Sequence, residues 1–449
     1  MNIKDKKITI LGAVRSGIGA AKLAKLHGAF PFVSDMGNPE KLETAAALLK
    51  TEQIDFEFGV HSQKVFDCDF IITSPGVPTN SAILVEALKR GIKVISEIEF
   101  AYWFCKGKII AITGTNGKTT TTSLCHYALN KCGVKAHVGG NIGFAFSEIV
   151  SQVKEDEFVV LELSSFQLDY IDTFKPNYSI LLNITPDHLD RYSYDFGKYA
   201  ASKLFISKNQ IESDYYIYNA DDEKINEFLS FNTKVSKQLF SIKNRVNTGA
   251  YSLKGELLFA NNGNEEVVCL DTDLSLKGEH NLYNSLSVLA ILKLIGIESE
   301  KIKNAFATFP GVEHRLEFVK EINGVQYIND SKATNVDAVW YALRSFRNPI
   351  YLILGGKDKG NDYNQIKTPV LNNVKKIYAI GSSADKVFNF FKDIVPTEKK
   401  DSLEDCLVSA KNEAVLNDIV LLSPACASFD MFDNYEHRGE VFKEIINNL

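Results

Sequence analysis

The chain has 449 residues, of which 45% are hydrophobic and 24% charged, and its formal net charge is −6 at pH 7. This composition is typical of globular proteins and excludes the disordered and fibrous classes. The acidic balance disfavours a broad surface for nucleic acid or membranes, so an anionic ligand would be held by local groups. The length is typical of roughly three domains.

We expect no signal peptide, because the first residues lead straight into an apolar run at residues 8–11 without a long apolar segment or a cleavage site. No apolar run approaches the length that spans a bilayer. The seven cysteines form no C-x-x-C pair, which is typical of reduced thiols. We therefore expect a cytoplasmic protein with no nucleic-acid or membrane partner.

Short apolar runs alternate along the chain with longer segments of helical periodicity. The runs lie at residues 8–11, 70–72, 109–112, 158–161, 180–182, 350–354, 377–380 and 419–422. Near-continuous apolar strands are expected where helices cover both faces of a sheet, and alternation with helices implies parallel strands. The sequence therefore predicts an α/β fold.

Residues 250–270 break this alternation. Lys254-Gly255 and Asn262-Gly263 are turn signals between short strand-like runs. They predict an antiparallel insertion near the end of the middle domain. We place the domain boundaries after residue 97 and near residue 311, which gives domains 1–97, 98–311 and 312–449.

A glycine-rich loop follows the apolar run at 109–112 and precedes a helical segment. It reads Thr113-Gly114-Thr115-Asn116-Gly117-Lys118-Thr119-Thr120. Its backbone N–H groups and the next helix N-terminus can face phosphate oxygens, while Lys118 adds a charge and Thr119 a hydroxyl for Mg²⁺. The full Walker pattern has glycine in place of Ile112, and the alternative is a glycine turn with an exposed lysine. The strand–loop–helix context favours a nucleoside triphosphate site.

Polar residues follow the next two apolar runs. Glu162 comes directly after the run at 158–161, and Asp187-His188 follow the run at 180–184. Ligands gather at such strand ends in open α/β sheets, and Mg²⁺ prefers oxygen ligands, so Glu162 is a candidate metal ligand. His188 is equally well explained as an ordinary structural histidine, and Lys203 as a solvated helix lysine.

The turn Gly12-Ala13-Val14-Arg15-Ser16-Gly17 can be interpreted as a dinucleotide fingerprint, with Asp35 at the end of the next strand. Val14 replaces the middle glycine of that fingerprint and would crowd a bound pyrophosphate. This replacement disfavours a nicotinamide-dependent oxidoreductase.

Several motifs together resemble the Mur ligases. They are the loop 113–120, LELSSFQL at 161–168, NITPDHLDR at 183–191, His314-Arg315, NDSKATN at 329–335 and SPACASFD at 423–430. The resemblance spans nearly the whole chain. The sequences of residues 161–168 and 423–428 are similar to those of the family member that adds D-glutamate. It implies a Rossmann-like N-terminal domain for a UDP group, a P-loop ATPase-like central domain with a mainly parallel sheet, and a Rossmann-like C-terminal domain for the amino acid.

The resemblance also implies a reaction, the ATP-dependent ligation of D-glutamate to UDP-N-acetylmuramoyl-L-alanine in cytoplasmic peptidoglycan precursor synthesis. The precursor carboxylate would attack the γ-phosphate of ATP to form an acyl phosphate, and the amine of D-glutamate would then displace phosphate. The implied cofactors are ATP and two Mg²⁺ ions, and we expect a monomer.

Carried onto this sequence, the resemblance assigns the central site. The implied catalytic set is Lys118, Glu162, His188, Lys203 and Lys332. The implied ATP contacts are Gly114, Thr115, Asn116, Gly117, Lys118, Thr119, Thr120, Asn281, Asn284, Arg315 and Asp330. The implied metal ligands are Thr119, Glu162, His188 and a carbamylated Lys203, whose new anionic oxygens would suit a cation.

The outer domains are assigned to the other substrates in the same way. The implied contacts to the UDP-sugar are Arg15, Ser16, Asp35, Met36, Ser74, Asn141 and His188. The implied contacts to D-glutamate are Thr334, Lys359, Ser428 and Tyr435, since two carboxylates call for cationic and hydroxyl donors. Tyr435 stands where the family often has phenylalanine, and the turn 355–359 departs from the commoner spelling, which leaves Lys357 as an alternative to Lys359.

Two alternatives stay open. Another amino-acid ligase of the same superfamily, such as an L-alanine-adding or folylpolyglutamate-forming enzyme, would share the phosphate loop and part of the metal site. Only the outer domains distinguish these ligases from one another, and the sequence of residues 423–428 favours D-glutamate as the substrate. A P-loop binding protein without ligation would leave a lysine metal ligand and a carboxylate-binding third domain unexplained.

Overall fold

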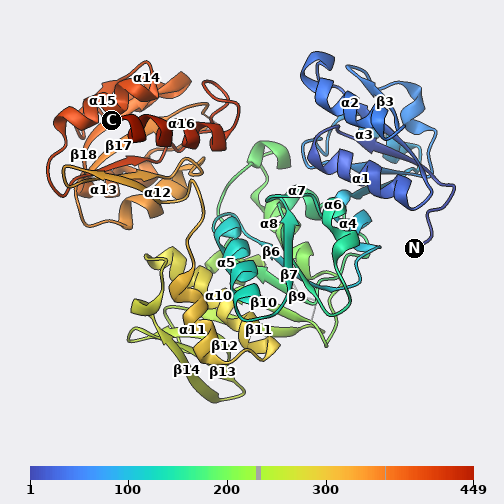
Figure 1. The fold of residues 1–449 in the computed structure, drawn as a ribbon, viewed down its shortest axis with the longest axis horizontal. Helices are drawn as coiled ribbons and strands as arrows, with labels where there is room; N and C mark the ends of the chain where they lie inside the picture. Colours follow the sequence, from blue (N-terminus) through green and yellow to red (C-terminus); the bar gives the residue numbers. More distant parts are fainter. Residues whose placement is uncertain (229–233, 359) are drawn as a thin grey trace. The chain divides into compact units, whose positions relative to one another are not determined.

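The computed structural model describes residues 1–228, 234–358 and 360–449. The chain forms two compact units (Figure 1). One comprises residues 1–275 and 282–309, and the other comprises residues 276–281 and 310–449. The first unit contains a five-stranded and a nine-stranded sheet, and the second contains a six-stranded sheet. Each sheet corresponds to one domain of a three-domain α/β fold, as predicted.

The N-terminal sheet is entirely parallel, with the strand order β3-β2-β1-β4-β5. Its strands are β1 (Lys7–Leu11), β2 (Phe30–Asp35), β3 (Asp55–Phe58), β4 (Phe70–Thr73) and β5 (Lys93–Ser96). The central strand is buried on both faces: Ile8 and Ile10 pack into one core, and Leu11 into another. This two-sided burial explains why residues 8–11 are all buried and, apart from Thr9, apolar.

The central sheet has the order β14-β13-β12-β11-β10-β9-β6-β8-β7. Its strands are β6 (Lys108–Thr113), β7 (Ala136–Gly140), β8 (Phe158–Glu162), β9 (Tyr178–Leu181), β10 (Tyr215–Asn219), β11 (Ser236–Ser241), β12 (Thr248–Leu253), β13 (Glu256–Asn261) and β14 (Asn264–Leu270). Pairing is parallel from β7 to β12, and β12, β13 and β14 pair antiparallel. The predicted antiparallel segment is confirmed, and it extends the same sheet.

The third sheet has the order β15-β16-β20-β17-β18-β19 and is parallel except for the pair β15 and β16. Its strands are β15 (Glu317–Ile322), β16 (Val325–Asn329), β17 (Ile350–Gly355), β18 (Val374–Ile380), β19 (Thr397–Lys399) and β20 (Ile419–Leu422). Alternate residues of β17 enter different cores, since Leu352 packs on one face and Ile353 on the other. Helices therefore cover both faces of this sheet.

Helices connect the strands within each domain (Figure 1). In the first unit they are α1 (Arg15–Leu26), α2 (Glu43–Thr51), α3 (Ala82–Lys89), α4 (Glu97–Tyr102), α5 (Lys118–Lys131), α6 (Phe146–Ile149), α7 (Ser165–Leu168), α8 (Phe196–Leu204), α9 (Glu223–Phe228) and α11 (Ser299–Thr308), and α10 (Glu279–Ile295) begins in the second unit. The second unit also has α12 (Val336–Arg344), α13 (Asn364–Asn373), α14 (Ala384–Phe391), α15 (Leu403–Glu413) and α16 (Tyr435–Asn448).

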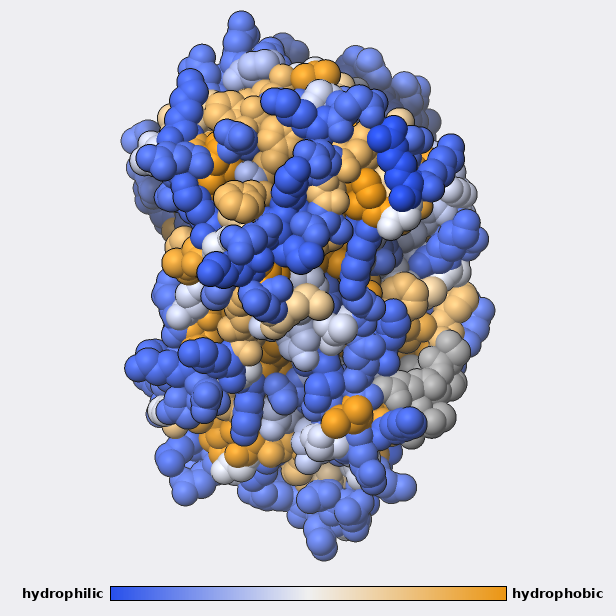
Figure 2. All heavy atoms as spheres, turned by 90° about the vertical axis from the view of Figure 1, so that its right-hand side faces the viewer, coloured by the Kyte–Doolittle hydropathy of each residue, from blue (hydrophilic) through white to orange (hydrophobic). Residues whose placement is uncertain are grey.

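Surface and thiol chemistry agree with a globular protein. On the face drawn in Figure 2, hydrophobic side chains lie in groups separated by hydrophilic ones. All seven cysteines belong to the described residues, and each is a free thiol. Within the part of the chain that the structure describes, no helix combines the length and the hydropathy needed to cross a membrane.

Gly140 ends β7 beside the last residue of β8. Its φ is +97°, and an added Cβ would lie 2.3 Å from the carbonyl oxygen of Glu162. Gly133, with φ +85°, has open space around the same position. We predict that Gly133→Ala lowers the free energy of unfolding by about 1–2 kcal/mol through backbone strain alone. Gly140→Ala should cost about 3 kcal/mol or more, because β8 must also shift.

Urea unfolding of the two variants measures this difference. Equal losses would show that the contact between Gly140 and β8 contributes nothing beyond the backbone conformation.

Candidate active site

The glycine-rich loop connects β6 to the N-terminus of α5. Gly114 (φ +155°) and Gly117 (φ +84°) adopt backbone conformations that other residues rarely adopt. Lys118 is the first residue of α5, whose first turn contains no acidic side chain. The dipole at this helix N-terminus therefore favours an anion.

Asn183 shapes this loop from the neighbouring strand end. Its Oδ1 accepts hydrogen bonds from the N–H groups of Thr115 (3.0 Å) and Asn116 (2.8 Å), and its Nδ2 donates to the carbonyl of Asn116 (3.0 Å). The side chain thus holds two successive peptide units of the loop. Asn183 lies within the motif 183–191, and its residue type alone predicts no role for it.

Lys118 and Lys203 both reach the backbone of the loop. Lys118 Nζ donates to the carbonyl oxygens of Gly114 (3.0 Å) and Thr115 (2.7 Å). Lys203 Nζ, on α8, also donates to the Gly114 carbonyl at 2.8 Å. The two side-chain nitrogens therefore share one acceptor, which places both lysines beside the phosphate loop.

Lys203 is almost completely buried, with 2% of its surface exposed. Burial lowers the pKa of its amine well below the usual value, and the nearby charge of Lys118 lowers it further; Asp187 and Asp169 act in the opposite direction. The exposed helix lysine that composition alone suggested is thus excluded. A buried amine of lowered pKa is neutral more often and is therefore nucleophilic.

Glu162, the last residue of β8, provides a partly unsatisfied carboxylate. Its Oε1 accepts a hydrogen bond from Asn141 Nδ2 at 2.8 Å. Its Oε2 is buried and has no hydrogen-bond partner among the described residues. A buried carboxylate oxygen without a donor is costly, and a cation would satisfy it.

His188 lies in the loop after β9, in a left-handed conformation (φ +52°). Its Nε2 is 3.7 Å from Asp187 Oδ2, and its ring packs edge-on against Phe166. Among the described residues, no group of three or more His, Cys, Asp or Glu side chains is placed to hold a metal. Glu162 and His188 are therefore individual candidates, not parts of a completed acidic cluster.

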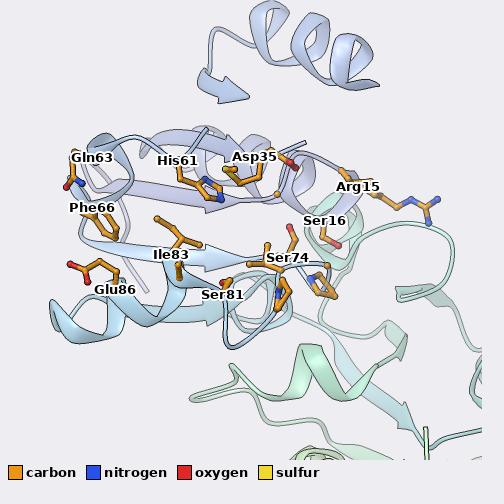
Figure 3. A pocket seen from close by; sticks show the side chains of 18 residues that line it. Arg15, Ser16, Asp35, His61, Gln63, Phe66, Ser74, Ser81, Ile83 and Glu86 are labelled. Carbon is orange, nitrogen blue, oxygen red and sulfur yellow. The ribbon is translucent and has the colours of Figure 1, made fainter. Parts of the chain in front are cut away.

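A cavity of about 920 Å³ opens in the N-terminal domain (Figure 3). Five of the residues predicted to contact the UDP-sugar line it: Arg15, Ser16, Asp35, Met36 and Ser74. Asn141 and His188 are not among its lining residues. Arg15 also donates to the carbonyl of Gly143, in the loop that carries Asn141.

Asp35 has a structural task in this cavity that the sequence did not reveal. One carboxylate oxygen accepts from the N–H of Ala13 and the other from the N–H of Gly37, each at 2.6 Å. The side chain thus joins the turn after β1 to the loop after β2. Each oxygen accepts one backbone hydrogen bond and keeps a further lone pair that can face a ligand.

The predicted ATP contacts outside the loop are distributed over both units. Asn284 belongs to the first unit and lies against the loop, because a Cβ at Gly117 would be 2.5 Å from Asn284 Oδ1. Asn281 belongs to the second unit and donates to the Lys277 carbonyl at 2.9 Å.

Asp330 and Arg315 also lie in the second unit. Asp330 is buried and accepts from Ser423 Oγ at 2.8 Å. Burial raises the pKa of its carboxyl to about 6, while the charge of Arg315 opposes this rise. The two side chains therefore interact electrostatically.

Tyr435, a predicted D-glutamate contact, lies against Lys332 of the predicted catalytic set. Lys332 Nζ donates to Tyr435 Oη at 2.7 Å and lies over its ring. Thr334 follows in the same loop as Lys332, and Ser428 is buried in the loop after β20. The predicted contact Lys359 lies outside the described residues, whereas Lys357 pairs by an isolated bridge with Ala427.

Arg438, on α16, connects these two loops and was not found by sequence reasoning. Its Nε and Nη2 donate to Ser331 Oγ (2.9 Å) and Ser331 O (2.7 Å), and its Nη1 donates to Cys426 O (3.2 Å). Burial lowers the pKa of the guanidinium to about 10. A buried arginine with three donated hydrogen bonds positions the loops 329–335 and 423–430 relative to each other. In the sequence, Arg438 is an arginine near the start of a helical segment, and no motif marks it as functional.

Comparison with known proteins agrees with this geometry. The MurD N-terminal domain matches residues 14–83, the Mur ligase middle domain 112–292, and the Mur ligase glutamate ligase domain 314–426. The UDP-N-acetylmuramoylalanine--D-glutamate ligase of Chloroherpeton thalassium is 44% identical, covering 100% of this chain and 99% of that protein. The ligase of the same name from Christiangramia forsetii is 45% identical, covering 99% and 100%.

The fold is shared more widely. The crystal structure of UDP-N-acetylmuramate-alanine ligase MurC from Thermotoga maritima aligns with a TM-score of 0.61 at 20% identity, covering 99% of each chain. The phosphate loop, the three-domain fold and these matches define an ATP-dependent ligase that forms amide bonds. The chain belongs to the Mur ligase family.

We predict that Asn183→Ala raises the dissociation constant for ATP about tenfold, because the loop loses the side chain that pre-organises its N–H groups. Calorimetric titration with ATP measures this. Asn130→Ala is the matched control: Asn130 also makes three hydrogen bonds to the backbone, to His126 and Ala136, but at the other end of α5. An equal loss of affinity in both variants would contradict the prediction.

Proposed function

We propose that this chain joins D-glutamate to UDP-N-acetylmuramoyl-L-alanine, with conversion of ATP to ADP and phosphate, in the cytoplasmic synthesis of peptidoglycan precursors. The observation that supports ligation most directly is the edge of the central sheet, where the phosphate loop, the buried Lys203 and the unpaired oxygen of Glu162 occur together. Full-length relatives with 42–45% identity carry the name of this D-glutamate ligase, which supports the choice of substrates.

The chemistry follows from the groups at that edge. The terminal carboxylate of the precursor attacks the γ-phosphorus of ATP, ADP leaves, and an acyl phosphate forms. The amine of D-glutamate then attacks the acyl carbon and releases phosphate, losing a proton as the amide forms. Catalysis by positioning and charge neutralisation suits phosphoryl transfer, and Lys118, at the start of α5, supplies a positive charge beside the loop.

The residues present fit Mg²⁺. Glu162 Oε2 is buried without a donor, and the hydroxyl of Thr119 belongs to the first turn of α5. These two residues would hold a first ion, which neutralises phosphate charge when bound. His188 and Lys203 would hold a second ion, provided that Lys203 carries a carboxylate.

Carbamylation supplies that carboxylate. The neutral amine of Lys203 adds to the carbon of CO₂ and loses one proton, which leaves an anionic carbamate. The buried position of Lys203 and the lowered pKa of its amine favour the first step. Burial would also protect the product from bulk water.

The two outer domains would bind the UDP-sugar and D-glutamate. The cavity lined by Arg15, Ser16 and Ser74 would take the nucleotide part of the UDP-sugar. D-glutamate would be held by Thr334, Ser428, Tyr435 and Lys359, with Lys357 as the alternative lysine. Lys332 would lie near the transferred phosphate. The enzyme would act as a monomer in the cytoplasm.

Phosphate release tests the reaction. Purified protein is supplied with ATP, Mg²⁺, UDP-N-acetylmuramoyl-L-alanine and one amino acid at a time. Release that occurs only with D-glutamate, together with the matching increase in precursor mass, is the expected result. Strong release with another amino acid would overturn the substrate assignment, and release independent of every amino acid would overturn ligation.

We predict that Lys203→Ala lowers kcat at least about 100-fold, because the second cation loses an anionic ligand. Short-chain carboxylic acids should restore part of the activity by entering the space that the side chain leaves. Lys198→Ala, at a largely exposed position on the same helix α8, is the control and should keep full activity. Full activity of Lys203→Ala would exclude a role for the carbamate.

A further inference from the structure

His61 is a titratable side chain of the nucleotide cavity that has no role in the reaction described above. It lies between β3 and the following 3₁₀ turn and faces Ile83 of α3 across the cavity (Figure 3). The acidic groups of the cavity are already engaged. Asp35 accepts from two backbone N–H groups, and Glu86 pairs with Arg90 at 2.8 Å.

A short hydrogen-bond chain fixes the imidazole of His61. Ser34 of β2 and Glu57 of β3 are direct register partners in the parallel pair. Ser34 Oγ lies 2.7 Å from Glu57 Oε1 and 2.7 Å from His61 Nδ1. Glu57 Oε1 also accepts from the N–H of Ser62 at 2.8 Å. Ser34 is fully buried, so neither of its contacts competes with bulk water.

Counting hydrogens in this chain determines the tautomer of His61. The hydrogen bonds from Ser62 and Ser34 hold the pKa of the Glu57 carboxyl below its usual value against the effect of burial, so the carboxylate is ionised and can only accept. Ser34 has one hydroxyl hydrogen, and the carboxylate at 2.7 Å is a much better acceptor than the Val60 carbonyl at 3.4 Å. The remaining lone pairs of Ser34 Oγ must then accept from His61 Nδ1, which therefore carries the hydrogen.

The other ring nitrogen is left as an acceptor. Burial lowers the pKa of His61, although the charges of Glu57 and Asp35 oppose this shift, and the ring is neutral at pH 7. A neutral imidazole with its hydrogen on Nδ1 has a bare lone pair on Nε2. No partner for Nε2 is found within the described part of the chain.

We propose that His61 is the residue that reads the base of the nucleotide substrate, with Nε2 accepting a hydrogen bond from N3–H of uracil. Cytosine presents a lone pair at N3, so two acceptors would face each other and the base would be rejected. The side chains of Met36, Phe66 and Ile83 give the same cavity apolar walls for a flat ring. This inference rests on the proposed function only in that the substrate carries a uracil nucleotide.

Binding of UDP and CDP to the full chain tests the proposal by calorimetry. The wild-type protein should bind UDP about 10- to 100-fold more tightly than CDP, because the wrong base leaves a desolvated acceptor unpaired. His61→Gln places an amide near Nε2 that can turn to offer either an acceptor or a donor, and the ratio should fall below about threefold. His27→Gln is the matched control: His27 ends α1 and stacks on Phe104 outside the cavity, so the wild-type ratio should be kept.

A second variant tests the hydrogen-bond chain without touching the base. Ser34→Ala removes the acceptor of Nδ1–H, so ¹⁵N NMR of the imidazole should show the Nε2–H tautomer appearing, and the UDP/CDP ratio should fall. Thermal unfolding of each variant verifies that it is folded. A purely structural role for Ser34 would change the unfolding temperature but neither the tautomer nor the ratio, and would overturn the proposal.

The outcomes separate this inference from the proposed reaction. An unchanged ratio in His61→Gln, equal affinity of the wild type for UDP and CDP, or no binding of either nucleotide would each overturn it. If base discrimination depends on His61 but no ligation of D-glutamate occurs, the proposed reaction fails and the base-reading role stands.

Discussion

Three adjacent parallel strands of the central sheet, β8, β6 and β9, end at one edge, and the chemistry of this protein depends on that arrangement. Parallel strands place the loops that follow them side by side. The phosphate loop follows β6, Glu162 ends β8, and Asn183 follows β9. The parallel pairing of these strands therefore brings residues that are far apart in the chain close together.

That edge contains polar groups whose hydrogen bonding is incomplete. A buried lysine amine and a buried carboxylate oxygen without a donor both oppose folding, since burial without full pairing is costly. Such groups persist where a ligand completes them, and a triphosphate with its cation has the required charges. These groups lower the free energy of unfolding. The apolar strands of the same sheet, whose side chains are fully buried on both faces, offset this loss.

The outer domains follow the same rule with different ligands. In the N-terminal domain, Ser34 and Glu57 are buried or half-buried polar residues on neighbouring strands, and Ser34 also contacts Nδ1 of His61, which lines the cavity. In the C-terminal domain, Arg438 holds two loops by three donated hydrogen bonds, so the side chains carried by those loops keep fixed positions. In each domain an inner hydrogen-bond network orients the groups that face the ligand.

The sequence alone determined the local elements and the central motif of this protein. The apolar runs at 109–112 and 158–161 became β6 and β8, because strands covered on both faces must be apolar at successive positions. The turn pairs at 254–255 and 262–263 became the turns of the antiparallel strands β12 to β14, because glycine tolerates the backbone conformation that such turns require. The loop 113–120 was recognisable because its spacing is a local property of the backbone.

Only the tertiary structure decided which polar side chains are buried and what each one contacts. From its sequence context, Lys203 is indistinguishable from a solvated helix lysine. In the structure α8 packs against the phosphate loop, and this packing removes water from the Lys203 amine. Asp35 was predicted to contact a ligand, and only the structure shows that its oxygens also accept backbone hydrogen bonds. The tautomer of His61 depends on a serine and a glutamate 27 and 4 positions earlier in the chain, which strand register alone brings into contact. Burial and hydrogen-bond partners are properties of packing between distant segments, and residue type and spacing do not encode them separately.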